Sequence, residues 1–260
     1  MIGIKKFHNI HKGKTCYIFG DGPSIKWFDL SQFNNHVGIS CGLQMIHKDF
    51  NKINVKYYAI PEPWLFHRYW HWRTKFKDKA KVLAMKKFMM NFINRHKYIN
   101  FFFNFSNIGA ISGSNIYLIH RYLIKHYSEL SFLNGMDPFG GTFNTVLFLA
   151  YYMGFSKVYL VGFDAFTDDW LSPFRWYEMG DGKTGRRNET TLDPFLKILK
   201  KKLDIYSISF HNSTKSEFNF KNISYSKLTK KNPIYKENYE LIELKTFKIM
   251  EKLLVNRKLS

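Results

Sequence analysis

The sequence predicts an α/β fold in which helices flank a mostly parallel sheet. Two short apolar runs, 15–19 and 158–161, each stop at a glycine-containing turn, Gly20-Asp21-Gly22 and Gly162-Phe163-Asp164. Continuous apolar runs of this length are typical of buried parallel strands. A nearly all-apolar segment at 143–152 precedes the second run and has the pattern of a buried helix. Helix, strand and turn in this order form half of a parallel crossover, which indicates an α/β sheet.

The first half of the chain adds further strand patterns. Ser24 follows the first turn and is expected to cap a short helix over 25–28. Pro61 ends one of the later strands, because proline cannot donate to a sheet ladder. The strands expected after the first are 37–41, 55–60, 81–85 and, as an edge strand or part of the aromatic core, 101–105.

The second half continues the alternation around one long polar segment. Residues 166–191 are polar, aromatic and rich in glycine, a composition more typical of a functional lid than of a structureless loop. We therefore expect one Rossmann-like α/β domain over 1–235, with the lid at about 166–191. A basic helix over 236–260 should dock on the core or lie on an anionic membrane. The other elements expected are a helix over 115–127, a helix after Leu192, a strand over 204–210 and a polar loop over 212–231.

The charge of the chain points to an anionic partner. Its 260 residues have a formal net charge of +20, and 18% of them are aromatic. Nucleic acid, an anionic membrane or acidic sugars would all suit such a charge, and a lysine-rich genome would also explain it. Cys16 and Cys41 lie in apolar runs, which is typical of small buried core residues. Free cysteines of this kind indicate a reducing compartment.

The location follows from what the sequence lacks. The N-terminus has no secretory signal pattern, and no uncharged apolar run reaches the ~18 residues that span a bilayer. We expect a cytoplasmic protein, or one that is peripheral on the inner face of the cytoplasmic membrane. The sequence leaves a homo-oligomer open.

Glycine-bearing corners at the strand ends predict a nucleotide site. In an open α/β sheet, ligands bind just outside the carboxyl ends of the strands. Glycine N–H groups and the helix start at Thr142 suit an anionic phosphate, while Asp21 and Asp164 suit ribose hydroxyls. Two simpler interpretations stay open: a tight surface turn at Gly20, and an Asp164 that only caps the next turn. No third glycine follows at the dinucleotide-site spacing, which disfavours NAD.

Four sequence blocks follow one another in order within roughly residues 14–210. They are Phe19-Gly20-Asp21-Gly22-Pro23-Ser24-Ile25, Gly141-Thr142-Phe143, Met153-Gly154-Phe155-Ser156-Lys157-Val158-Tyr159-Leu160 and Gly162-Phe163-Asp164-Ala165-Phe166. This ordered set resembles the bacterial sialyltransferases of glycosyltransferase family 42. A more distant similarity is to flagellin glycosyltransferases and pterin pyrophosphokinase-like proteins that share a Gly-x-Gly-Pro-Ser-Leu loop. The resemblance implies a single parallel α/β domain with a lid, and metal-independent transfer of sialic acid from CMP-sialic acid to a glycan.

Carried over by position, the resemblance implies a nucleotide-binding set. Thr142 stands where the family has a serine near the CMP, and Gly42 stands where it has an asparagine. The residues expected to line the nucleotide are Gly20, Asp21, Gly22, Ser24, Gly42, Gly141, Thr142, Gly162, Asp164, Ala165 and Phe166.

The chain departs from the family at the catalytic base. The resemblance implies a histidine just after the lid, but the chain has none between His126 and His211. A carboxylate is then expected to act as the base, and His211 is a second choice. The carboxylate candidates are Asp181, Glu178 and Glu189. The residues expected to bind the CMP phosphate, since guanidinium groups match phosphate geometry, are Arg175, Arg186 and Arg187.

We therefore predict a glycosyltransferase that moves an acidic sugar (sialic acid, a related nonulosonate or Kdo) from a CMP-activated donor to a glycan or glycolipid acceptor of lipopolysaccharide or capsule. Neither metal nor cofactor is expected, and a retaining route stays open beside the inverting one. A magnesium-dependent pterin pyrophosphokinase-like phosphotransferase is the alternative, with Asp168, Asp169 and Asp181 as ligands, although no Walker motif supports it. A basic nucleic-acid-binding protein is a third, less favoured alternative, because no recognised binding motif is present; nucleic acid is therefore not an expected partner.

Overall fold

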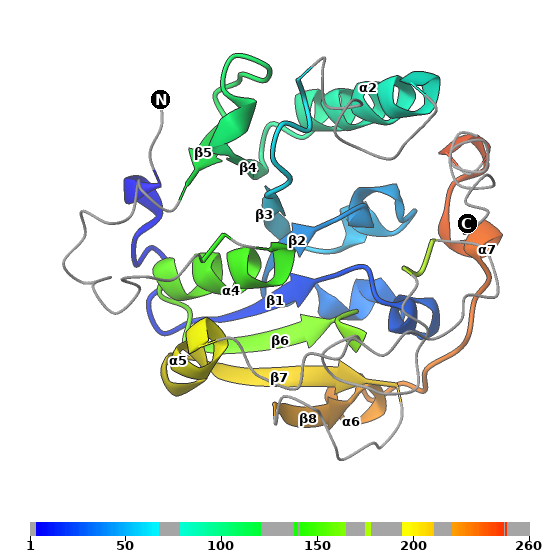
Figure 1. The fold of residues 1–260 in the computed structure, drawn as a ribbon. Coiled ribbons are helices and arrows are strands. Elements are labelled where there is room, and N and C mark those ends of the chain that lie inside the picture. The colour runs from blue at the N-terminus through cyan, green and yellow to red at the C-terminus, as the bar shows by residue number, and fades with distance from the viewer. Residues whose placement is uncertain are drawn as a thin grey trace.

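A computed structural model describes residues 4–67, 79–120, 138–139, 141–164, 175–177, 194–210, 220–246 and 248. Within them, eight strands form one sheet in the order β5-β4-β3-β2-β1-β6-β7-β8 (Figure 1). Every neighbouring pair is parallel. The predicted α/β class with a mostly parallel, Rossmann-like sheet is therefore confirmed. The strands are β1 (Thr15–Phe19), β2 (Val37–Cys41), β3 (Val55–Ile60), β4 (Asn100–Asn104), β5 (Ile116–Ile119), β6 (Lys157–Val161), β7 (Asp204–Ser209) and β8 (Lys221–Ser224).

Two apolar cores cover the two faces of the sheet. Alternate residues of a strand point to opposite faces, so Cys16 and Ile18 of β1 enter one core while Tyr17 and Phe19 enter the other. The first core is completed by α4 (Thr142–Tyr152) and α5 (Pro194–Lys202), and the second includes residues of α2 (Lys79–Arg95). The shorter helices are η1 (Lys5–Phe7), η2 (Pro23–Trp27), η3 (Leu30–Phe33), η4 (Gln44–Ile46), η5 (Phe50–Lys52), η6 (Phe105–Asn107), α6 (Tyr225–Thr229) and α7 (Asn238–Leu241).

Most of the expected elements are confirmed at or near their predicted bounds. The strands 37–41 and 55–60 are β2 and β3, the buried helix is α4, and the helix after Leu192 is α5. Residues 101–104 of the run 101–105 lie in β4, an inner strand between β3 and β5 rather than an edge strand, and Phe105 begins η6. Cys16 and Cys41 are buried and free, as expected of small core residues. In the part of the chain that the structure describes, no helix is long and apolar enough to cross a bilayer.

Four local expectations are wrong. Residues 81–85 lie in α2 rather than in a strand, since Lys, Leu, Ala and Met are strong helix formers and the apolar run is too short to decide. The expected helix over 115–127 begins instead with β5, which pairs with β4; its residues 121–127 lie outside the described part. The polar loop over 212–231 contains β8 and α6. Ser24 is not the helix cap: Gly22 is, and Ser24 is buried within η2.

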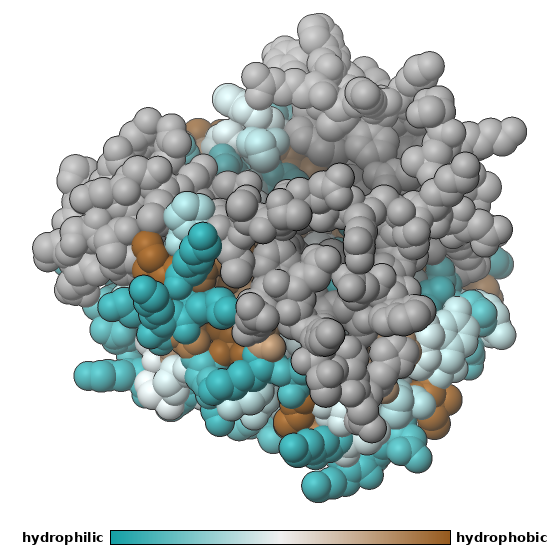
Figure 2. Space-filling view, turned by 60° about the horizontal axis from the view of Figure 1, so that its bottom comes forward, coloured by the Kyte–Doolittle hydropathy of each residue, from teal (hydrophilic) through white to brown (hydrophobic). Residues whose placement is uncertain are grey.

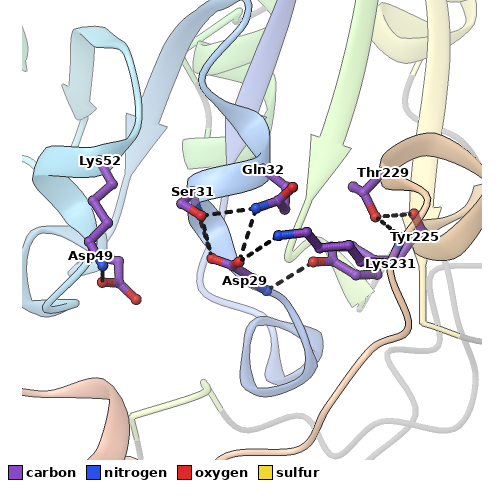
Figure 3. Close-up of polar contacts among 8 residues, drawn as sticks. All are labelled: Asp29, Ser31, Gln32, Asp49, Lys52, Tyr225, Thr229 and Lys231. Carbon is purple, nitrogen blue, oxygen red and sulfur yellow. Dashed lines mark hydrogen bonds and ion pairs between the residues drawn. The ribbon is translucent and has the colours of Figure 1, made fainter.

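The C-terminal segment packs on the connections that follow β1 and β2. Ile234 N donates to Trp27 O at 3.0 Å, and Lys48 N donates to Leu241 O at 2.8 Å. Asp29 accepts hydrogen bonds from Ser31 and Gln32, and Lys231 lies 3.7 Å from its carboxylate (Figure 3). The basic helix expected over 236–260 is described only in its first part, where α7 ends at Leu241 and Ile242 is extended and pairs with His47. The rest of that helix stays a prediction. Hydrophilic residues cover much of the described surface in Figure 2, with small hydrophobic areas among them.

Candidate functional site

Two of the predicted glycine corners meet at the carboxyl ends of β1 and β6. These strands are neighbours, and the sheet grows outward from them in both directions: β2 to β5 on one side, β7 and β8 on the other. This is a topological switch point, where open α/β sheets bind their ligands. Gly20 N donates to Val161 O at 2.8 Å, and Gly22 N donates to Gly162 O at 2.7 Å. The two turns therefore form one hydrogen-bonded unit.

Gly20 and Gly22 allow the close approach of these two turns. A Cβ at Gly20 would lie 2.6 Å from Gly162 O, and a Cβ at Gly22 would lie 2.2 Å from Asp164 Oδ2. Asp164 is buried, and its Oδ2 accepts the N–H of Ser24 at 2.8 Å. Asp164 thus holds the β1 turn against the β6 turn, the structural role that the sequence left open beside ribose binding.

Asp21 joins the β1 turn to the β2 turn and to a third segment. Its carboxylate accepts the N–H of Leu43 at 3.0 Å and the hydroxyl of Tyr177 at 3.3 Å. Gly42 has φ +63°, and a Cβ there would lie 1.7 Å from Asp21 Oδ2, so only glycine fits beside this carboxylate. Burial raises the pKa of Asp21 to about 7, and Leu43 and the positive charge of Arg175 oppose that rise only in part.

Trp176 anchors the segment that carries Arg175. Its side chain is fully buried, and its Nε1 donates to Gln44 Oε1 at 3.0 Å. Its ring also lies edge-on to His47, with 5.2 Å between centroids. Arg175 itself is exposed, and its charge acts on Asp21 and on Glu62. The structure therefore brings this predicted phosphate-binding arginine to the carboxyl edge of the sheet.

The third predicted corner, the start of α4, belongs to the same site. Gly141 is the N-cap, and a Cβ there would meet no atom within 4 Å, so space beside the helix start is open. The N–H groups of a first helical turn have no partners within the helix and favour anions. The Thr142 hydroxyl hydrogen-bonds to the Glu62 carboxylate and thereby lowers the pKa of that group.

Glu62 is a site residue that the sequence reasoning missed. It follows β3, and burial raises its pKa although the positive charge of Arg175 lowers it. The side chain is nevertheless exposed. Glu62 therefore keeps accessible surface, although nearby protein atoms partly desolvate its carboxylate. The sequence does carry a signal for this residue, an acidic side chain between Pro61 and Pro63 at a strand end. From the sequence, these prolines predicted only the end of the strand.

Several predicted site residues lie outside the part of the chain that the structure describes. Their roles stay predictions. They are Asp181, Glu178 and Glu189 as candidate bases, Arg186 and Arg187 as phosphate ligands, and Ala165 and Phe166 as nucleotide contacts. Among the described residues, no group of three or more His, Cys, Asp or Glu side chains is arranged to hold a metal ion.

Comparisons with solved structures return glycosyltransferases at low similarity. The sialyltransferase CstII from Campylobacter jejuni, in complex with a substrate analogue, cytidine-5'-monophosphate, is 14% identical with a TM-score of 0.49, and the match covers 94% of this chain and 99% of that one. The MAf glycosyltransferase from Magnetospirillum magneticum AMB-1 is 14% identical with a TM-score of 0.45, covering 95% of this chain and 37% of that one. The sialyltransferase CST-II in complex with a trisaccharide acceptor and CMP is 14% identical with a TM-score of 0.43, and the match covers 93% of this chain and 100% of that one. No protein-family model and no curated protein matches the chain. Similarities this low do not establish an activity, so function has to be argued from the residues of the site.

Proposed function

We propose that the protein is a glycosyltransferase that moves an acidic sugar from a CMP-activated donor to a glycan or lipid-linked acceptor, without a metal ion or cofactor. The donor sugar would be sialic acid, a related nonulosonate or Kdo. The observation that carries the proposal is the meeting of the β1 turn, the β6 turn, the start of α4 and Arg175 at one switch point of a parallel sheet. The ordered motifs of the sequence give the same answer.

The leaving group explains why these parts belong together. When the sugar leaves CMP, negative charge develops on the phosphate, and fixed positive groups aimed at that charge lower the barrier. The open N-terminus of α4 and the guanidinium of Arg175 would supply them without a metal. The predicted Arg186 and Arg187 would add to this charge. A net charge of +20 would also attract an anionic donor and an anionic acceptor.

A thermal-shift panel with CMP, CDP, UDP, ATP and single-stranded DNA, with and without magnesium, tests the donor class. A ligand that binds only the folded state raises the melting temperature. CMP should stabilise the protein without metal, and Arg175→Ala should weaken that effect. Stabilisation by ATP that requires magnesium would favour the phosphotransferase instead. Stabilisation by DNA alone, lost with added salt, would indicate a nucleic-acid-binding protein.

The predicted bases are tested by two conservative variants. Asp181→Asn and Glu178→Gln should each leave stabilisation by CMP unchanged, and if one of the two residues is the base, its variant should slow release of CMP from the donor. If neither variant changes turnover, neither residue is the base.

Contact with an anionic membrane surface completes the proposal. Ile234, Tyr239 and Leu244 of the C-terminal segment are each 67–68% exposed, and Lys236 and Lys245 lie beside them in the chain. Exposed apolar groups among lysines suit the surface of an anionic bilayer. The protein should co-sediment with vesicles that contain phosphatidylglycerol but not with pure phosphatidylcholine vesicles, and added salt should weaken the binding.

A further inference from the structure

The backbone of Glu62 is fixed more firmly than a loop position usually is. Pro61 and Pro63 flank it; each proline ring fixes its own φ, and Pro63 also restricts the backbone of Glu62. Asn107 is fully buried, and its Nδ2 donates to Glu62 O at 3.1 Å. The Oδ1 of the same Asn107 accepts the N–H of Phe66 at 2.9 Å. The loop after β3 is therefore clamped onto η6, while the residue Glu62 itself is exposed.

Glu62 is the acidic side chain at this edge that is open to a ligand. Three acidic residues lie within three positions of the carboxyl end of a described strand: Asp21, Glu62 and Asp164. Asp164 is buried against Ser24, and the Asp21 carboxylate is engaged by Leu43 and by Tyr177. Glu62 is exposed.

The surroundings of Glu62 suit a proton acceptor beside the reacting bond. Thr142 hydrogen-bonds to the Glu62 carboxylate and is the first residue of α4. The start of α4 would hold the donor phosphate. The anomeric carbon attached to that phosphate would therefore lie close to the Glu62 carboxylate. Desolvation raises the pKa of Glu62, whereas Arg175 and Thr142 lower it. A bound phosphate would neutralise Arg175 and add a negative charge, and both changes make a carboxylate more basic. The other ionisable groups facing this position are Asp21 and Cys41.

We propose that Glu62, in place of the carboxylates that the sequence suggested, is the general base of the transfer, an inference that rests on the proposed function. The acceptor hydroxyl gives its proton to a carboxylate oxygen of Glu62 as its oxygen forms the new bond to the anomeric carbon. The bond from that carbon to the phosphate oxygen breaks, and CMP leaves with the electron pair. Glu62 then releases the proton to water on its open side.

The test separates binding from turnover in three variants. Glu62→Gln and Glu62→Ala are compared with wild type and with Glu243→Gln, a matched change at an exposed carboxylate of the C-terminal segment. Binding is measured as the thermal shift with CMP, and turnover as CMP release from CMP-sialic acid and from CMP-Kdo. A positioned base contributes about 10²–10⁴-fold to rate, so Glu62→Gln should lose at least about 100-fold in CMP release and keep the thermal shift. Added sodium formate should restore part of the rate to Glu62→Ala, which a purely structural role would not allow.

The outcomes distinguish this inference from the proposed function. If CMP does not stabilise wild type, or if wild type releases CMP from neither donor, the proposed function fails and the assignment of Glu62 fails with it. If wild type binds and turns over while Glu62→Gln does so equally well, only the assignment of Glu62 is overturned. Loss of the CMP shift in Glu62→Gln, with no formate rescue of Glu62→Ala, would also overturn it, because Glu62 would then serve binding.

Discussion

Replacing Asp21 with asparagine is expected to change how the stability of the protein depends on pH. Burial raises the pKa of Asp21 from 3.8 to about 7 in the folded state. A carboxyl group whose folded-state pKa is raised stabilises the fold fully at pH values below its unfolded-state pKa, and that stability is lost as the pH rises through the folded-state pKa. At 1.36 kcal/mol per pKa unit, the rise from 3.8 to about 7 sets an upper bound of about 4 kcal/mol lost across this interval, because Asp21 keeps some accessible surface.

Urea denaturation of wild type and Asp21→Asn between pH 4 and pH 9 measures this loss. Asparagine keeps an oxygen that can accept the N–H of Leu43 but does not titrate. The free energy of unfolding of Asp21→Asn, relative to wild type, should therefore rise by up to about 4 kcal/mol from pH 4 to about pH 7 and stay level above it.

Asp204→Asn is a control of opposite sign. Its carboxylate accepts a hydrogen bond from Lys221 Nζ at 2.5 Å, and this contact lowers the pKa of Asp204. Its stabilising effect is present at neutral pH and is lost as the pH falls. Because the pair is partly exposed, the effect should be less than about 1 kcal/mol. A pH-independent difference for Asp21→Asn, or one that falls as the pH rises, would refute the desolvation argument.

Three further substitutions test how the site is held together. Gly42→Ala should lower the free energy of unfolding clearly more than Gly109→Ala. Both positions have positive φ, but only at Gly42 would the new Cβ lie 1.7 Å from a carboxylate oxygen. Equal losses of stability by urea denaturation would contradict the close contact with Asp21. Trp176→Phe should lower the free energy of unfolding by about 1–3 kcal/mol, since it leaves the buried Gln44 Oε1 without its donor. The control Trp64→Phe, at a position that is 42% exposed, should lower it by less than about 0.5 kcal/mol. Asn107→Ala removes the donor to Glu62 O and the acceptor of Phe66 N and should cost about 1–3 kcal/mol; a neutral effect on the melting temperature would show that the clamp on the loop is weak.

Local sequence patterns were sufficient to predict an element where its own residues favoured one secondary structure clearly. Short apolar runs bounded by glycine or proline predicted β1, β2, β3 and β6, and the all-apolar segment before Gly154 predicted α4. They failed where a short apolar run suited two structures equally. The run at 116–119 has helical spacing, but β4 offers it a hydrogen-bonding edge, and it becomes β5. Residues 81–85 had strand-like content, but they continue into a longer helix-forming stretch and become part of α2.

The sequence by itself determined the class of the fold, the edge of the sheet at which a site forms and the glycines that form its corners, because these follow from the period of the apolar residues and from the backbone freedom of glycine. Only the tertiary structure decided the tasks of the acidic residues there. Asp164 holds a neighbouring turn, Asp21 is desolvated between three segments, and Glu62 is left open beside Thr142 and Arg175. Whether a carboxylate braces the fold or faces a ligand depends on which donors and charges surround it. Here those groups come from the segments after β1 and β2, from α4 and from residues 175–177, far apart in the chain and adjacent only in the folded protein.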